Sequence, residues 1–282
     1  MKGLFEMSAI KRIKSFVKNT PLIGKLAEKV YRQFVPGPEK YIFTRFGWEK
    51  ESQESGKPEV QQILNLLNYT KTSGASYAAK KYPAGYHSLE IEGSIIKGQR
   101  DPFNRLKRLE IDFAGLRVLD IGCNQGGMLF SLYDRIKWGV GVDYDYRLIN
   151  CCSKIGYQTG KNNKLSFYSF NIDHDPHEII LDMLPEPVKK VDVVFLLAVC
   201  MWVEKWREII DLCAAISPVL VFESNGSPEV QAGQIAHVKS RYSEVEMIED
   251  SNNGNRQLMV ARNDPGGVSA VPTPCGVRDL RS

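Results

Sequence analysis

The sequence predicts an α/β fold: a doubly wound, seven-stranded, mostly parallel sheet with an antiparallel C-terminal hairpin and a helical N-terminal extension. Two observations support this prediction. Between residues 116 and 241, five short apolar runs alternate with five stretches of helical periodicity, which is typical of parallel βαβ units. After them, residues 244–248 and 257–261 have the pattern of two strands. The turn-rich loop 251–255 joins them, which predicts the antiparallel hairpin.

The composition is that of an ordinary globular protein. Of the 282 residues, 43% are hydrophobic and 25% are charged, which excludes collagen, coiled-coil rods and disulfide-rich miniproteins. No stretch offers the roughly 18 uninterrupted apolar residues of a membrane-spanning helix. The six cysteines form no CxxC pair. We therefore expect buried thiols in a reducing cytoplasm rather than disulfides or a metal site.

The net charge is unevenly distributed along the chain. It is +4 overall, but residues 1–34 hold eight Lys or Arg and two Glu, so the remainder carries −2. A near-neutral body argues against a nucleic-acid surface spread over the whole fold. Residues 10–34 repeat apolar side chains at helical spacing, with a break at Pro21 and basic residues on the other faces. This arm either packs on the body, or lies on an anionic membrane surface or an acidic partner.

Shifts in composition divide the chain into four parts. The expected parts are a basic amphipathic helical arm and linker (1–58), a lid or acceptor-side segment (59–110), the core (111–262) and a disordered tail (263–282). Within the second part, residues 82–100 alternate like a hairpin around Gly93. Apolar spacing predicts helices on either side of this hairpin, at 60–69 and 103–111.

The core elements alternate in chain order. Apolar runs predict strands at 117–121, 138–142, 165–170, 191–199 and 219–222. Helical spacing predicts helices at 127–136, 146–155, 176–183, 203–216 and 228–241. Because each helix connects two strands, we expect the strand ends to meet at one edge, where ligands bind in such sheets.

The strongest motif is VLDIGCNQGG, residues 118–127. A buried strand ends in the carboxylate of Asp120, and a turn of small residues then opens a helix. Gly122 and Gly126 let the backbone turn sharply and approach a ligand, and Asn124 tolerates left-handed dihedrals. The free N–H groups at the helix start favour a negative group. The next strand ends in Asp143, whose carboxylate suits two ribose hydroxyls.

This run resembles motif I of the class I S-adenosylmethionine-dependent methyltransferases. The resemblance covers roughly residues 116–262, about half of the chain. One departure is Asn124, which stands where the usual pattern has a third glycine. A nicotinamide-dependent dehydrogenase is the competing interpretation of a glycine-rich turn. The dinucleotide fingerprint fits poorly here, because Asp120 would place a charge beside a pyrophosphate.

The resemblance implies a set of S-adenosylmethionine-binding residues. Asp120, Gly122 and Gly126 match the positions that hold the methionine part, and Asn124, in place of the third glycine, is expected to keep that binding. Asp143 matches the ribose-binding acid. The end of the third strand would contact the adenine and the end of the fourth would line the methyl-transfer site; the residues there are Asn171, Ile172, Asp173 and Leu197. Arg100, from the segment before the core, would reach the cofactor carboxylate or else form a surface salt bridge.

Two residues are the candidates for catalysis on the acceptor side. Glu223 directly follows the strand 219–222 and would serve as a general base, as an acceptor-orienting group or as a loop cap. His87 belongs to the upstream segment, together with Tyr86. Trp202 follows the fourth strand and would wall the acceptor pocket or simply pack. We identify no metal site in the sequence.

The sequence therefore predicts an S-adenosylmethionine-dependent methyltransferase that methylates an oxygen of a small molecule or of a cell-surface glycan precursor. We expect it in the cytoplasm, with peripheral contact to the inner face of an anionic membrane through residues 10–34. One alternative is an RNA methyltransferase that grips phosphates with the basic arm. A second alternative, without catalysis, is a degenerate cofactor-binding scaffold or a membrane-associated interaction protein.

Overall fold

The structure is a computed structural model. It describes residues 58–71, 81–91, 93–185, 187, 189–248 and 256–263. The chain divides into the units 1–57 and 58–282, and every described residue belongs to the second. The predictions for the arm at 10–34 and for the tail beyond Asn263 lie outside the described residues. Within the described part of the chain, no helix is long and apolar enough to cross a membrane.

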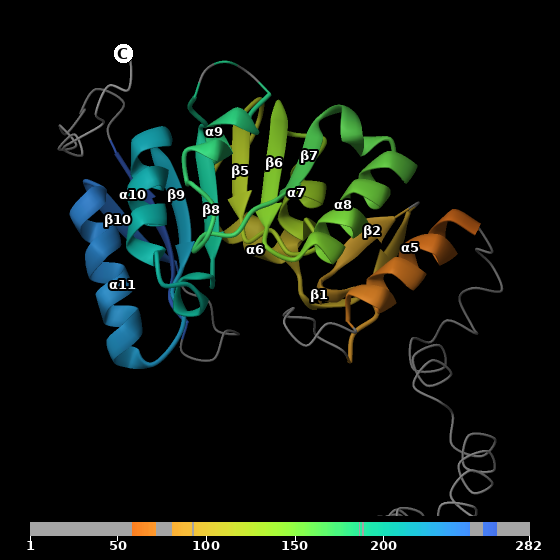
Figure 1. Ribbon diagram of the computed structural model, residues 1–282, viewed down its shortest axis with the longest axis horizontal. Coiled ribbons are helices and arrows are strands. Elements are labelled where there is room, and N and C mark those ends of the chain that lie inside the picture. The colour runs from red at the N-terminus through yellow and green to blue at the C-terminus, as the bar shows by residue number, and fades with distance from the viewer. Residues whose placement is uncertain are drawn as a thin grey trace, which may run out of the picture. The chain divides into compact units, whose positions relative to one another are not determined.

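A seven-stranded sheet forms the centre of the described residues (Figure 1). Its spatial order is β10 (Glu244–Ile248), β11 (Leu258–Arg262), β9 (Val219–Glu223), β8 (Val193–Leu197), β5 (Arg117–Ile121), β6 (Trp138–Asp143) and β7 (Leu165–Ser169). All neighbours are parallel except β11, which is antiparallel to both β9 and β10. The structure confirms the predicted doubly wound sheet and its closing hairpin.

The order of the strands positions the site. From β5 the chain passes outward to β6 and β7, and then returns to β8 and β9 on the other side of β5. The carboxyl ends of β5 and β8 are therefore a topological switch point, where the loops diverge and leave a crevice. The pairs Ile121 with Val142 and Ile121 with Leu196 set the register there.

Helices cover the sheet and connect its strands. The core helices are α7 (Gly127–Leu132), α8 (Tyr146–Gln158), α9 (Ile179–Asp182), α10 (Trp206–Ile216) and α11 (Pro228–Arg241). Apolar side chains of α9, α10 and α11 share one buried cluster with the sheet. The five cysteines of the described residues are buried and free, as the sequence predicts. Burying a large apolar side chain of the cluster, such as a valine or an isoleucine, stabilises the fold by roughly 1.5–3 kcal/mol.

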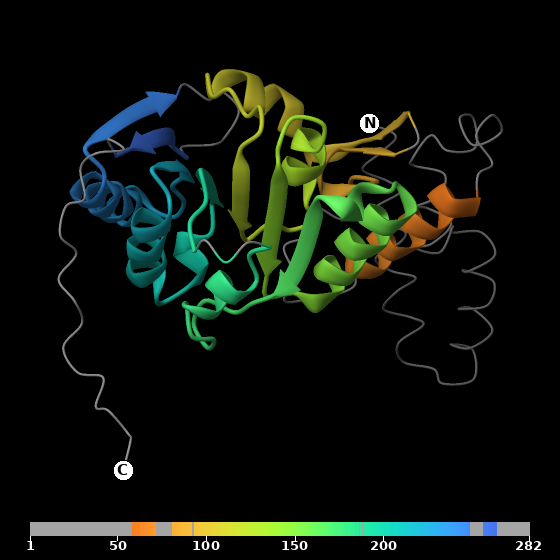
Figure 2. The same cartoon turned by 90° about the horizontal axis from the view of Figure 1, so that it is seen from above.

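The segment before the core consists of two helices and four short strands. They are α5 (Pro58–Thr70), β1 (Gly85–His87), β2 (Leu89–Ile91), β3 (Ser94–Ile96), β4 (Gly98–Arg100) and α6 (Pro102–Arg108). β2 and β3 form the predicted antiparallel hairpin, but β1 and β4 pair in parallel. In Figure 2, α5 lies beside α8 at the opposite end of the sheet from α11.

Several elements are shorter than the sequence predicts. β8 ends at Leu197 because Ala198 has a left-handed φ of 58°, which a strand does not accommodate. α7 ends at Leu132 and α10 begins at Trp206. Apolar residues just outside these elements belong to turns that pack on the core, so hydrophobicity alone extends the predicted ranges too far.

Candidate functional site

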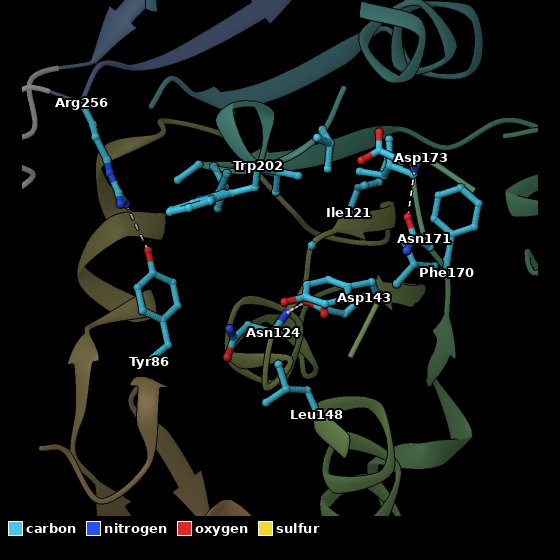
Figure 3. Close-up of a pocket in the computed structure, with 18 residues that line it drawn as sticks. Tyr86, Ile121, Asn124, Asp143, Leu148, Phe170, Asn171, Asp173, Trp202 and Arg256 are labelled. Atoms are coloured by element: carbon cyan, nitrogen blue, oxygen red, sulfur yellow. Dashed lines mark hydrogen bonds between the residues drawn. The ribbon is translucent and has the colours of Figure 1, made fainter. Parts of the chain in front are cut away.

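A cavity of about 540 Å³ lies at the switch point (Figure 3). Loops after β5, β6, β7 and β8 line most of it, and β1 and the residues before β11 contribute one side chain each. The lining residues are Tyr86, Ile121, Gly122, Asn124, Val142, Asp143, Tyr144, Leu148, Phe170, Asn171, Ile172, Asp173, Leu197, Ala198, Val199, Trp202, Val203 and Arg256. Seven of the cofactor-binding candidates belong to this set.

The loop after β5 is closely packed, and its backbone requires small residues. Gly122, Asn124 and Gly126 have φ values of 77°, 51° and 70°, in the left-handed region that disfavours most side chains. A Cβ on Gly122 would overlap a methyl group of Val199. The backbone N–H groups of Gly122 and Cys123 both donate to the Val142 carbonyl. The loop is thereby fixed against β6.

Asp143 lies at the tip of β6 and is only 8% exposed. Its Oδ2 accepts a 2.9 Å hydrogen bond from the Asn124 N–H, and its Oδ1 accepts a 3.0 Å bond from the Asp145 N–H. Burial raises the pKa of this carboxyl to about 6, although these backbone hydrogen bonds oppose the shift. Each oxygen keeps a further lone pair for a ligand hydroxyl.

Asp120 stands one strand away and does not line the cavity. It is 2% exposed, and its Oδ2 has no hydrogen-bond partner. Burial and the nearby Asp143 raise the pKa of Asp120 to about 8, while Arg105 opposes the shift. The sequence predicts a negative charge on Asp120 beside the turn, whereas a carboxyl with a pKa of about 8 is mostly protonated at neutral pH. A carboxyl buried without a partner takes up a proton more easily than it holds a charge.

One end of the cavity is formed by the residues after β7. Phe170, Asn171, Ile172 and Asp173 all line it. The amide oxygen of Asn171 accepts from the Asp173 N–H at 3.0 Å, which closes a turn. Asp173 Oδ1 accepts from the N–H groups of two residues before α10, at 2.8 and 3.0 Å. These polar side chains therefore hold the loop, and the phenyl ring and the isoleucine present apolar surface.

The opposite end of the cavity is formed by side chains from distant segments. Figure 3 shows Tyr86 and Arg256 together, with Trp202 beside them, away from Asn171 and Phe170. Arg256 Nη1 donates to the Tyr86 hydroxyl at 3.5 Å. Trp202 is 64% exposed, although it lines the cavity.

Two buried amides position this end. Gln125 Oε1 accepts from the N–H groups of Tyr86 and His87 at 3.1 and 3.2 Å, which attaches β1 to the glycine loop. Asn225 donates to the Ala198 carbonyl at 2.6 Å and accepts from the Met201 N–H at 3.0 Å. The loop that carries Trp202 is therefore fastened to the end of β9.

Glu223 is fully buried and does not line the cavity. Its Oε2 lies 3.0 Å from Arg105 Nη1, and its Oε1 lies 3.7 Å from Arg256 Nη1. A carboxylate that is buried between two guanidinium groups is held in one position, away from the cavity surface. Of the readings that the sequence leaves open, this geometry favours the orienting role over the general base.

His87 and Arg100 also lie outside the cavity lining. His87 packs on Gly127, where a Cβ would overlap its ring. Burial, helped by Arg105 and Arg100, lowers the pKa of His87 to about 3, so its ring is neutral at physiological pH. Arg100 pairs with His87 through the backbone of β1 and β4. The structure does not bring either side chain to the cavity surface with the other candidates.

The sequence argument missed Arg105, Arg256 and Asn225. Arg105 is hidden in the helical pattern of α6, and Asn225 in a short loop. Arg256 lies two residues before the start of β11, at the sheet edge where the other strand tips meet. This place in the sequence is the feature that could have identified Arg256 as a site residue, because a cation at that edge of the sheet faces the crevice.

Comparison with known proteins bears on the fold. No protein-family model matches the chain, and no curated protein matches it. EvdMO1 is 14% identical with a TM-score of 0.50, over 62% of this chain and 44% of that protein. Its N-terminal domain, crystallised in the presence of SAH and D-fucose, is 14% identical with a TM-score of 0.49, over 63% of this chain and 90% of that domain. An O-methyltransferase family protein from Burkholderia thailandensis is 13% identical with a TM-score of 0.46, over 58% of this chain and 56% of that protein.

The strand order, the antiparallel β11 and the likeness to EvdMO1 together define the fold class. This chain has the fold of the class I S-adenosylmethionine-dependent methyltransferases. At 14% identity the likeness speaks for the fold alone, and it spans less than half of EvdMO1. What the site does must therefore be argued from its own residues.

Proposed function

We propose that this protein is an S-adenosylmethionine-dependent methyltransferase that methylates an oxygen of a small molecule or of a glycan precursor. One observation carries the proposal. The Asp143 carboxylate, a left-handed glycine loop and an apolar slot after β7 meet around a single cavity. A sulfonium nucleoside needs these three features: a ribose acceptor, a close backbone approach and an adenine slot.

The residues fit the proposed methyl donor. Asp143 would hold the ribose hydroxyls, and Phe170 and Ile172 would enclose the adenine. Gly122 would let the methionine part approach the backbone, since any side chain there would meet Val199. The Oδ2 atom of Asp120 has no hydrogen-bond partner, and the ammonium group of a donor bound beside the glycine loop would favour the ionised form of this carboxyl. The donor, when bound, supplies a methyl group on a sulfur that leaves readily.

The rest of the chain positions the acceptor and excludes water. The cavity is of ordinary size for a small ligand. The side chains of Val199, Trp202 and Val203 give part of its lining an apolar surface. Holding the two reactants in line in a dry site accounts for most of what such a displacement requires. The near-neutral body supports a small acceptor over a polyanionic one.

Calorimetry with SAH tests the donor site. We expect binding by the wild-type protein and a loss of at least tenfold in affinity for Asp143→Ala, since hydrogen bonds to a charged group contribute about 1.5–3 kcal/mol. Asp134→Ala, on the rim of a different cavity, is the matched control and should bind as the wild type does. Absence of binding by the wild type would contradict the proposal.

Turnover with a labelled methyl donor tests the acceptor class. Pooled sugars, small acids, lipids and RNA are offered in separate reactions, and the demethylated nucleoside is measured. We expect turnover with a small-molecule or sugar pool. Turnover with RNA alone would contradict the small-acceptor proposal and would support the RNA alternative.

A further inference from the structure

Trp202 presents an exposed aromatic ring inside the candidate site. It lines the cavity, yet it is 64% exposed, which is more than any other large apolar residue of the lining. In Figure 3 the indole extends toward Tyr86 and Arg256, at the end of the cavity away from Phe170. Under the function proposed above, this is the acceptor end, and the end that contains Asp143 and Phe170 is the donor end.

The indole of Trp202 has no partner within the described part of the chain. None of the described residues accepts a hydrogen bond from its N–H, and no described aromatic ring or cation lies against its ring. A tryptophan usually buries its ring and pairs its N–H, because exposed apolar area is unfavourable in water. A large ring left open inside a cavity therefore indicates a surface that a ligand covers.

The loop that carries Trp202 is held in place by hydrogen bonds. The Trp202 N–H donates to the Val199 carbonyl at 2.9 Å. Asn225 binds the backbone on both sides of Cys200, at Ala198 and at the residue before Trp202. The exposed ring is therefore presented by an ordered backbone, and a surface that is ordered in advance lowers the cost of binding a ligand.

The surroundings of this ring are partly apolar and partly polar. Val199 and Val203 line the cavity with it, whereas the Tyr86 hydroxyl and Arg256 Nη1, 3.5 Å apart, lie at the same end (Figure 3). A ligand that fits here has a flat apolar face and a polar edge. A sugar ring has both, because its C–H groups lie on its faces and its hydroxyl groups around its edge. The partly positive C–H hydrogens match the negative face of an indole.

Two other classes of acceptor fit this end less well. A planar aromatic acceptor has two apolar faces, and the face turned away from Trp202 would meet polar side chains or water, which leaves its apolar area uncovered. An acyclic polyol has hydroxyl groups but no flat face, so it would leave the indole exposed.

We propose that the acceptor is a sugar whose ring stacks on Trp202. The inference rests on the methyltransferase function proposed above and names its substrate class, together with the residue that selects it. The C–H face of the sugar covers the indole, and hydroxyl groups at its edge reach the indole N–H and the polar groups nearby. Trp202 acts by binding and orienting the acceptor.

Saturation-transfer NMR on the SAH-saturated protein tests the stacking. The probes are the methyl pyranosides of glucose, galactose, mannose and rhamnose, with sorbitol as an acyclic polyol and catechol as a planar aromatic. We expect at least one pyranoside to receive saturation, mostly at the C–H groups of one face, and sorbitol to receive none. Saturation of catechol alone, equal saturation of sorbitol, or no saturation of any pyranoside would overturn the proposal.

Variants test whether Trp202 is the surface involved. Trp202→Ala should lower the affinity for the bound pyranoside at least tenfold, and Trp202→Phe, which keeps a ring but lacks the N–H, should lower it less. Tyr157→Ala removes an aromatic ring that is 72% exposed and outside the cavity lining, and it should bind as the wild type does. Unchanged affinity in Trp202→Ala would overturn the proposal.

Fluorescence quenching gives a second measurement on the same surface. Acrylamide quenches exposed indoles, and a stacked sugar should shield Trp202 from it, whereas Trp138 is only 6% exposed. We expect the pyranoside to reduce quenching in the wild-type protein and not in Trp202→Phe. A reduction that persists in Trp202→Phe would place the sugar elsewhere and would overturn the proposal.

Turnover separates this proposal from the function on which it rests. With a labelled methyl donor, Trp202→Ala should raise the KM for the accepted sugar at least tenfold, while kcat and the SAH affinity stay within threefold of the wild type. Label transferred to an aromatic pool and not to sugars would overturn the acceptor class alone. If the wild-type protein does not bind SAH, the methyltransferase function fails, and sugar binding without SAH still tests Trp202.

Discussion

The two ends of the cavity are built in different ways. At the proposed donor end, Asn124 follows β5 and Asp143 ends the neighbouring parallel strand β6, and the backbone N–H of Asn124 donates a 2.9 Å hydrogen bond to the Asp143 carboxylate. At the acceptor end, Tyr86, Glu223 and Arg256 come from three segments that are far apart in the sequence, and side chains join them. A site shaped by the backbone of one loop needs particular small residues at fixed spacing. A site formed by side chains from distant segments needs only that the fold brings those segments together.

This difference predicts different responses to mutation. Changes at the donor end should remove nucleoside binding, because the backbone itself makes the site. Changes at the acceptor end should spare nucleoside binding and alter stability or acceptor turnover.

Gly122→Val should be the most damaging change. Valine is strained at a φ of 77°, and its side chain would meet Val199. Strain and overpacking each cost about 1–3 kcal/mol, so we expect a loss of about 4 kcal/mol and no detectable SAH binding. Urea unfolding and calorimetry measure the two effects. Gly160→Val also introduces valine at a left-handed φ, but into open space, and should keep SAH affinity. Normal binding by Gly122→Val would contradict the account of the loop.

Glu223→Gln should destabilise the fold while sparing the donor site. It removes the negative charge that lies 3.0 Å from Arg105, whose side chain is 7% exposed. Breaking a buried pair costs about 3 kcal/mol. Urea unfolding measures the loss, and SAH affinity should stay within threefold of the wild type. Glu246→Gln, in an exposed ion pair with Arg262, is the control. An equal loss of SAH binding would mean that the two ends are not independent.

Asp120→Asn should stabilise the protein without ligand in alkaline solution. Because burial raises the pKa of Asp120 from 3.8 to about 8, the folded chain keeps a proton that the unfolded chain releases, and stability falls as pH rises between these values. Asparagine removes this penalty, so the variant should gain about 1–3 kcal/mol over the wild type at pH 8 and little at pH 4. Unfolding at both pH values measures it; a gain that does not depend on pH would contradict the assignment.

Trp202→Ala should have the smallest effect on stability. The side chain is 64% exposed, and exposed substitutions usually change stability by about 0.5 kcal/mol or less. Turnover of the acceptor should fall, since the ring forms part of the wall beside Arg256. Measuring the melting temperature together with turnover separates the two. A large loss of stability with full turnover would make Trp202 a packing residue.

The same division explains what the sequence could predict. β5 and α11 have their predicted bounds, and the glycine loop and the Asp143 position follow from local spacing and a familiar motif. The charge state of Asp120 could not be predicted, because it depends on burial contributed by other segments. The pairing of Glu223 with Arg105 spans 118 positions, and no local pattern encodes such a contact. Its assignment as an anchor required the fold.

A crystal structure of the protein with SAH tests the central claim most directly. The account predicts both ribose oxygens within about 2.6–3.2 Å of the Asp143 carboxylate, with the adenine between Phe170 and Ile172 and the sulfur directed toward Tyr86 and Arg256. A nucleoside bound elsewhere, or ribose hydroxyls that face away from Asp143, would contradict it.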